Sequence, residues 1–175
     1  MRCTACGYQN FDNLGLCEAC EEPLDATGGC DADRDIGRLI SNEPLSALHP
    51  APAVTVPPTT PVAQAIRMLA ERNIGCLLVT SGDALLGIFS ERDALQRIGP
   101  NYYELIDRPI SDFMTPDPVT LTPEDSIAFA LNRMDINDFR HIPVRNPDGT
   151  LGIISVRDCL AYVTRHFPEL KSHTN

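Results

Sequence analysis

The sequence from Pro44 onward contains an internal repeat, in which each residue of the first copy is matched 65 positions later without a gap. The copies agree best where Leu86–Leu95 is matched by Leu151–Leu160. Core packing alone explains a repeat of apolar positions, but this repeat also preserves a Gly, a Ser, an Arg and an Asp in fixed order. Such side chains supply the hydrogen-bond donors and acceptors that a polar ligand needs. The sequence therefore predicts two similar units with two sets of candidate ligand-binding groups.

The sequence of each copy predicts five secondary-structure elements in the order strand, helix, strand, strand, helix. The first helix is signalled by Thr60 before Pro61 in one copy and by Asp125 before Ser126 in the other, since Thr and Asp are good N-caps and Pro suits the first helical position. Apolar residues at helical spacing follow each signal. Two apolar runs separated by turn residues then predict a pair of strands in each copy. These runs are Cys76–Val79 with Leu85–Phe89, and His141–Val144 with Leu151–Ile154.

Four sequence motifs, together with this order of strands and helices, resemble the CBS domain. The two copies together resemble the CBS pair, or Bateman module. The resemblance covers about Pro44 to His166 and implies a mixed α/β (α+β) fold. It also implies that the two copies pack sheet to sheet around a pseudo-twofold axis, leaving two clefts that bind adenosine nucleotides in many members. We expect repeat 1 at 44–108, repeat 2 at 109–168 and a tail at 169–175. The motifs are Gly87–Asp93, Gly152–Asp158, Pro109–Thr115 and Arg140–Val144.

The preserved Ser and Asp residues have two interpretations. Ser90 with Asp93, and Ser155 with Asp158, fit capping boxes that satisfy the free N–H groups of a helix start. The same helix start is also a place for phosphate. The resemblance implies this second role, with Ser donating to phosphate, Asp accepting ribose hydroxyls and Arg neutralising charge. The nucleotide-binding candidates are Thr55, Ser90, Arg92 and Asp93 in the first copy, and Thr120, Arg140, His141, Pro143, Ser155, Arg157 and Asp158 in the second.

The two predicted clefts differ where Gly75-Cys76 of the first copy stands in place of Arg140-His141 in the second. Family members commonly place basic groups facing the phosphates here, so we expect the second cleft to suit polyphosphate better. A core or rim histidine is the alternative interpretation of His141. Cys76 and Cys159 are expected to be buried thiols. No catalytic set of nucleophile, base and orienting group is evident, so a non-enzymatic role is expected.

Four cysteines near the N-terminus have the spacing of a metal site. Cys3-x-x-Cys6 and Cys17-x-x-Cys20 give two short knuckles, as tetrahedral zinc coordination by four sulfurs requires. The segment resembles a zinc ribbon, predicted at residues 1–24 with room for one small hairpin between the pairs. Iron, as in rubredoxin, fits the same sulfurs, whereas a redox dithiol needs a larger supporting fold. An acidic linker is expected at 25–43, with Cys30 as a spare thiol.

The composition narrows the classes of partner. With 175 residues and 43% hydrophobic residues, the chain can bury one domain-sized core. The absence of an apolar run of about 18 residues excludes a membrane span. The N-terminus lacks the apolar stretch of a secretion signal, so a cytoplasmic protein is expected, in which cysteines bind metal more often than they form disulfides. A net charge of −10 makes nucleic-acid binding unfavourable.

These features predict a cytoplasmic sensor that binds AMP, ADP or ATP in the clefts of a CBS pair and relays occupancy to a protein partner through the metal ribbon. The alternatives are an iron electron carrier and a structural or assembly protein without ligand. We also expect a homodimer, formed through the apolar faces of the helices that begin near Val62 and Ile127.

Overall fold

The structure is a computed structural model of the chain, and it describes residues 3, 6–8, 17, 19–20 and 39–166. The hairpin predicted between the cysteine pairs, Cys30, most of the acidic linker and the tail 169–175 lie outside these residues. Residues 39–42, at the end of the predicted linker, are helical. No helix in the described part combines the length and the apolar character needed to cross a membrane.

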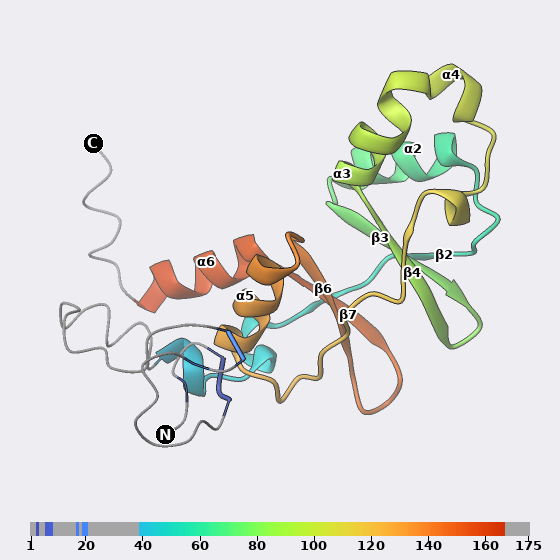
Figure 1. Cartoon of the computed structure of the whole chain (residues 1–175). Helices are drawn as coiled ribbons and strands as arrows, with labels where there is room; N and C mark the ends of the chain where they lie inside the picture. The colour runs from blue at the N-terminus through green and yellow to red at the C-terminus, as the bar shows by residue number, and fades with distance from the viewer. Residues whose placement is uncertain (1–2, 4–5, 9–16, 18, 21–38, 167–175) are drawn as a thin grey trace. The chain divides into compact units, whose positions relative to one another are not determined.

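The repeats form a mixed α/β fold with two sheets (Figure 1). In the first sheet β2 runs parallel to β3, and β3 forms an antiparallel pair with β4, with Cys76 opposite Ser90. The predicted strand pair of each copy is confirmed, because β6 and β7 are also neighbours. The order β2-β3-β4-β5 joins Thr55–Val56, Cys76–Ser81, Ala84–Ser90 and Thr115–Pro116; the order β1-β7-β6 joins Ala51–Pro52, Leu151–Ser155 and His141–Arg145.

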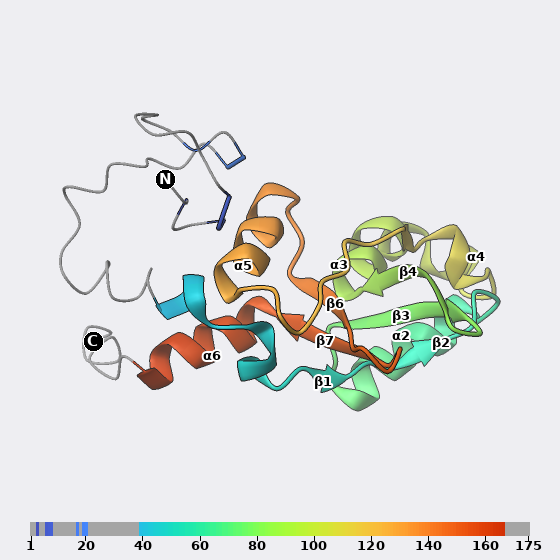
Figure 2. The same cartoon turned by 90° about the horizontal axis from the view of Figure 1, so that it is seen from below.

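The first helix of each copy packs its apolar face into a core. Helix α2 (Val62–Arg72) buries its apolar residues under the first sheet, and α5 (Ile127–Ile136) does the same in the other core. Figure 2 shows α5 lying beside α6 (Val156–His166). The expectation that these apolar faces form a dimer interface is therefore wrong, since each is already covered by its own core. The buried side chains are Val62, Ala65 and Leu69 in α2, and Ile127, Ala128, Ala130 and Met134 in α5.

Both predicted N-caps are displaced by one residue. Pro61 is the N-cap of α2 without a side-chain hydrogen bond, and the Thr60 hydroxyl donates to the Pro57 carbonyl instead, at 2.7 Å. In the second copy the N-cap is Ser126, whose side chain accepts from a backbone N–H in the first turn of α5. The Asp125 carboxylate instead accepts from the preceding loop. Cap residues that follow one another in the sequence compete for the role, so local signals define the helix start only to within a residue.

The two copies exchange their first segments. Leu45, at the start of the turn η1 (Leu45–Leu48), is fully buried with α5, β6 and α6, and its N–H donates to the Asp125 carbonyl at 2.8 Å. Ile110, exactly one repeat later, begins η4 (Ile110–Asp112) and is fully buried with α2, β3 and β4, where its N–H donates to the Thr60 carbonyl at 2.8 Å. Each sequence repeat thus supplies the first core residue of the other.

The chain accordingly divides into two compact units that differ from the two sequence repeats. Described residues within Met1–Pro50, Leu121–Val144 and Ile154–Asn175 make one unit, and those within Ala51–Thr120 and Arg145–Ile153 make the other. One boundary between these spatial units falls near residue 50, because the segment before it packs in the core of the second repeat.

The last helical region differs between the copies. In the second copy α6 is one continuous helix of 11 residues. In the first copy α3 (Glu91–Asp93) gives way to a π-helical turn, η2 (Ala94–Ile98), then to a 3-10 turn, η3 (Gly99–Asn101), and to α4 (Tyr102–Leu105). Pro100 explains the break, because proline has no N–H and its ring collides with the carbonyl four residues earlier. The Gly99 N–H bonds to the Ala94 carbonyl, which closes the wider π turn.

Candidate functional site

The second Ser-x-x-Asp set lies where β7 runs into α6. The Ser155 N–H and Oγ both donate to Oδ2 of Asp158, each at 2.7 Å, and the Asp158 N–H reaches Ser155 Oγ at 3.4 Å. The capping box predicted here is therefore present. It uses only one carboxylate oxygen, and within the part of the chain that the structure describes Oδ1 of the exposed Asp158 has no hydrogen-bond or ion-pair partner.

The first Ser-x-x-Asp set has the same cap but a different environment. The Ser90 N–H and Oγ donate to Oδ2 of Asp93 at 2.9 and 2.6 Å, and the Asp93 N–H reaches Ser90 Oγ at 3.3 Å. Asp93 is only 8% exposed. Capping of this kind contributes about 1 kcal/mol of helix stability, and it positions each carboxylate in the same way at both sites.

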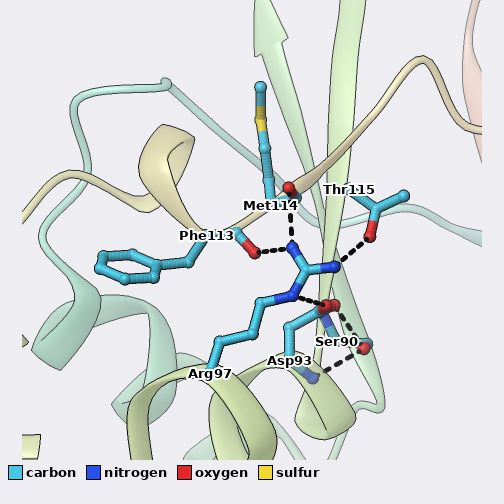
Figure 3. Close-up of polar contacts among 6 residues, drawn as sticks. All are labelled: Ser90, Asp93, Arg97, Phe113, Met114 and Thr115. Carbon is cyan, nitrogen blue, oxygen red and sulfur yellow. Dashed lines mark hydrogen bonds and ion pairs between the residues drawn. The ribbon is translucent and has the colours of Figure 1, made fainter. Parts of the chain in front are cut away.

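Arg97 is the residue that the sequence analysis missed. Its Nε lies 3.3 Å from Oδ1 of Asp93, and its Nη1 donates to the carbonyls of Phe113 and Met114 at 2.7 and 3.1 Å. Figure 3 shows the guanidinium between the Asp93 carboxylate and this backbone segment, with Nη2 directed at Thr115 Oγ1. The available signal was the spacing of an Asp and an Arg four residues apart on a helix.

The second copy holds a pocket of about 350 Å³ next to its Ser-x-x-Asp set. Val156, which follows Ser155, lines the pocket and donates its N–H to the Arg140 carbonyl at 3.1 Å. Arg140 itself is exposed at the pocket, and His141 begins β6 as a half-buried residue. The wall combines apolar, acidic and basic side chains, namely Leu131, Met134, Phe139, Val156, Asp135, Asp138 and Arg140.

The remaining predicted site residues lie on strands, in the loop before α5 or beside the helix starts. Thr55 is exposed in β2, and the Thr120 hydroxyl donates to the Pro118 carbonyl at 3.0 Å. Pro143 is buried in β6, and its carbonyl accepts from the backbone of Leu121. Arg92 and Arg157 directly precede the two aspartates, the first half-buried and the second exposed.

The two cysteines of the repeats are buried, as predicted. Burial raises the pKa of the Cys76 thiol to about 12, and the nearby Glu91 acts in the same direction. Burial likewise raises the pKa of Cys159 to about 11, with a smaller contribution from Asp158. Both thiols are therefore protonated at neutral pH, and packing explains their presence.

The four N-terminal cysteines come together as a cluster. Their sulfurs lie within 4.8 Å of one another, with Cys3 Sγ 3.6 Å from Cys20 Sγ and Cys6 Sγ 3.5 Å from Cys17 Sγ. Tetrahedral zinc with bonds near 2.3 Å separates its sulfurs by about 3.8 Å, so the donor set and spacing fit such an ion. Gly7 has a φ of 74°, which glycine adopts without strain, and its N–H closes the first knuckle onto the Cys3 carbonyl.

Comparison with known proteins gives the family. The family model of the CBS domain matches residues 45–99 and 110–165. The CBS domain-containing protein CBSCBSPB1 of Arabidopsis thaliana is 30% identical over 139 residues, which make up 79% of this chain but only 23% of that protein. The chain thus spans about a quarter of the length of this relative.

Solved structures agree with this assignment. A CBS-domain containing protein from Agrobacterium tumefaciens is 28% identical, with a TM-score of 0.62 over 67% of this chain and 94% of that one. A CBS domain protein from Pyrobaculum aerophilum, solved in complex with AMP, is 26% identical, with a TM-score of 0.59 over 70% of this chain and 98% of that one. The repeated motifs, the two sheets and these matches together show that the chain belongs to the CBS domain family, with two tandem copies of the domain.

Proposed function

We propose that this protein is a regulatory module that binds an adenosine nucleotide (AMP, ADP or ATP) and relays its occupancy to a protein partner. The observation that carries the proposal is the open carboxylate oxygen of Asp158 at the start of α6, beside a pocket. The AMP bound to the Pyrobaculum aerophilum protein supports the same class of ligand.

The chemistry of the second set suits a nucleotide. A carboxylate oxygen with no protein partner accepts hydrogen bonds from both hydroxyls of a ribose, and charge-assisted bonds of this kind are strong. The first turn of α6 presents backbone N–H groups and a partial positive charge, which favour phosphate. Arg140, His141 and Arg157 are the basic side chains proposed to act there. The Ser155 hydroxyl donates to Oδ2 of Asp158, so it would donate to phosphate only after giving up that bond.

Titration calorimetry with AMP tests the proposal. Asp158→Ala removes at least one charge-assisted hydrogen bond, worth about 1.5 to 3 kcal/mol, so AMP should bind at least about tenfold more weakly. We expect Asp93→Ala to have the smaller effect. Asp107→Ala is the matched control, since it removes an exposed carboxylate outside both sets. AMP binding by Asp158→Ala with the affinity of the parent would mean that the Ser-x-x-Asp sets are only helix caps.

We also propose that the cysteine cluster binds one zinc ion and that this segment contacts the partner. Cys3, Cys6, Cys17 and Cys20 would hold the metal, which would supply the folding energy of a segment with few apolar residues. Residues 1–43 contain three Arg and nine acidic residues, which favours a protein partner over a nucleic acid. Native mass spectrometry reads the metal mass, the nucleotide and the number of subunits together. A red protein that bleaches on reduction would identify iron and an electron carrier instead.

A homodimer is part of the proposal. Leu95 and Leu160 occupy equivalent positions of the two copies and are 74% and 57% exposed, so each copy presents a large apolar side chain that its own core does not use. Sedimentation of the full chain at micromolar concentration should give twice the monomer mass, and a monomer would remove this part of the proposal.

A further inference from the structure

The carboxylate of Asp93 is more fully used by the protein than that of Asp158. A carboxylate has about four lone-pair positions, two on each oxygen. At both sites Ser donates twice to Oδ2, through its N–H and its hydroxyl. Nε of Arg97 forms an ion pair with Oδ1 of Asp93 at 3.3 Å, whereas Oδ1 of Asp158 has no hydrogen-bond or ion-pair partner among the described residues. A ribose diol needs two acceptor positions, and only Asp158 offers both on one oxygen.

Arg97 is held in place from the opposite side as well. Its Nη1 donates to the carbonyls of Phe113 and Met114, and its Nη2 lies 3.4 Å from Thr115 Oγ1 (Figure 3). These acceptors follow η4, which is anchored in the same core by the fully buried Ile110. The rigid fork of a guanidinium matches such an arrangement better than a flexible ammonium does. A ligand at Asp93 must therefore displace a side chain with several fixed partners.

The local fold directs Arg97 to this position. It lies in the π-helical turn η2, which Pro100 imposes on the first copy only. Single π turns in otherwise α-helical segments frequently occur at functional sites. The equivalent residue of the second copy, Tyr162, is 8% exposed, packs in its core and stacks on His166 with ring centroids 4.2 Å apart. The second copy thus has no cation at this point of its helix.

We propose that Arg97 is a specificity-determining residue that occupies Asp93 in place of a ribose diol, so that the first Ser-x-x-Asp set is closed to nucleotides and the second is open. The inference rests on the proposed function and adds to it the residue that makes the two sets unequal. The ligand class is a nucleotide with both ribose hydroxyls, because those hydroxyls compete with the guanidinium for the same oxygen.

Calorimetry with AMP on the full chain tests this assignment. The parent should bind one AMP per chain, and Arg97→Ala should bind two, with the affinity of the first set raised at least about tenfold, as one charge-assisted hydrogen bond implies. The added site should disappear in the double variant that carries both Arg97→Ala and Asp93→Ala. Gln96→Ala, which changes the exposed neighbour on the same turn, is the control and should bind as the parent does. An Arg97→Ala protein that gains no AMP site overturns the inference.

Two further measurements separate this result from a change in folding. Arg97→Met keeps the aliphatic stem and removes the cation, so it should gain the same site even where Arg97→Ala is poorly folded. The gained site should bind 2′-deoxy-AMP at least about tenfold more weakly than AMP; equal binding overturns the role of the diol. If the parent protein binds no adenosine nucleotide, the proposed function is contradicted. If a nucleotide site then appears only when Arg97 is replaced, that result still supports the inference that Arg97 closes the first Ser-x-x-Asp set.

Discussion

The exchange of first segments predicts that Leu45 stabilises the core of the second repeat and not that of its own. Leu45→Ala removes a side chain that is fully buried among Ile127, Ile142 and Tyr162. Truncations of this kind cost about 2 to 5 kcal/mol, from lost burial and from the cavity left behind. A loss of 1 kcal/mol lowers the melting temperature of a small domain by about 4 to 8 °C. We therefore expect a fall of at least about 8 °C in the transition of that unit.

Hydrogen exchange locates the effect along the chain. Leu45→Ala should reduce amide protection more in β6 and α6 than in β3 and β4. Ile110→Ala, its counterpart one repeat later, should show the opposite pattern because Ile110 packs beside β3 and β4. Ile136→Ala is the control, since this isoleucine is 54% exposed and its loss should cost less than about 0.5 kcal/mol. Reduced protection in β3 and β4 on Leu45→Ala, with β6 and α6 unchanged, would refute the exchange.

Three further changes test the metal site, the close packing of β4 and the buried thiols. Cys17→Ser should release the metal and unfold only the N-terminal segment, and native mass spectra that keep the full metal mass would contradict the four-sulfur site. Gly87→Ala should lower the free energy of unfolding in urea by about 1 to 3 kcal/mol, because a Cβ there would lie 2.5 Å from Met114 Sδ and 2.9 Å from the Thr115 carbonyl oxygen. Unchanged stability would show that the neighbouring backbone moves aside at no cost. Burial raises the pKa of Cys76 from 9.0 to about 12, so the contribution of this thiol to stability is complete below pH 9 and declines as the pH approaches 12. Cys76→Ala should therefore lose less stability at alkaline pH than the parent does, as measured by melting temperature against pH. An equally steep loss in the variant would assign that loss to other groups.

The elements of the repeats were predictable because each local signal appears twice. Apolar runs bounded by turn residues gave β3, β4, β6 and β7, and the Ser-x-x-Asp spacing gave both helix starts, since a capping box is closed by atoms three residues apart. The exchange of Leu45 and Ile110 was not predictable in the same way. A repeat in register shows which residues are equivalent, but equivalent residues pack equally well in either core. Tertiary contacts decide between those two arrangements.

Arg97 was missed for a related physical reason. Comparison of the copies selects residues that they share, and Arg97 stands opposite Tyr162. Its partners Phe113 and Met114 lie 16 and 17 residues away, across a break in the helix that only the structure defines. The shared residues describe what both sites have in common, whereas the positions that differ make the two sites unequal.

The contacts of Arg97 also link the first Ser-x-x-Asp set to the backbone that follows η4. A ligand shifts a conformational equilibrium only as far as it interacts differently with the two states. At Asp93 a ribose would compete directly with Arg97, and Arg97 holds the backbone of Phe113 and Met114. Under our proposal, a ligand that entered the first set would have to release these two carbonyls, whereas the open Oδ1 of Asp158 would accept a ligand without a comparable rearrangement. Under our proposal, Arg97 in place of a tyrosine therefore accounts for one set that is closed and one that is open.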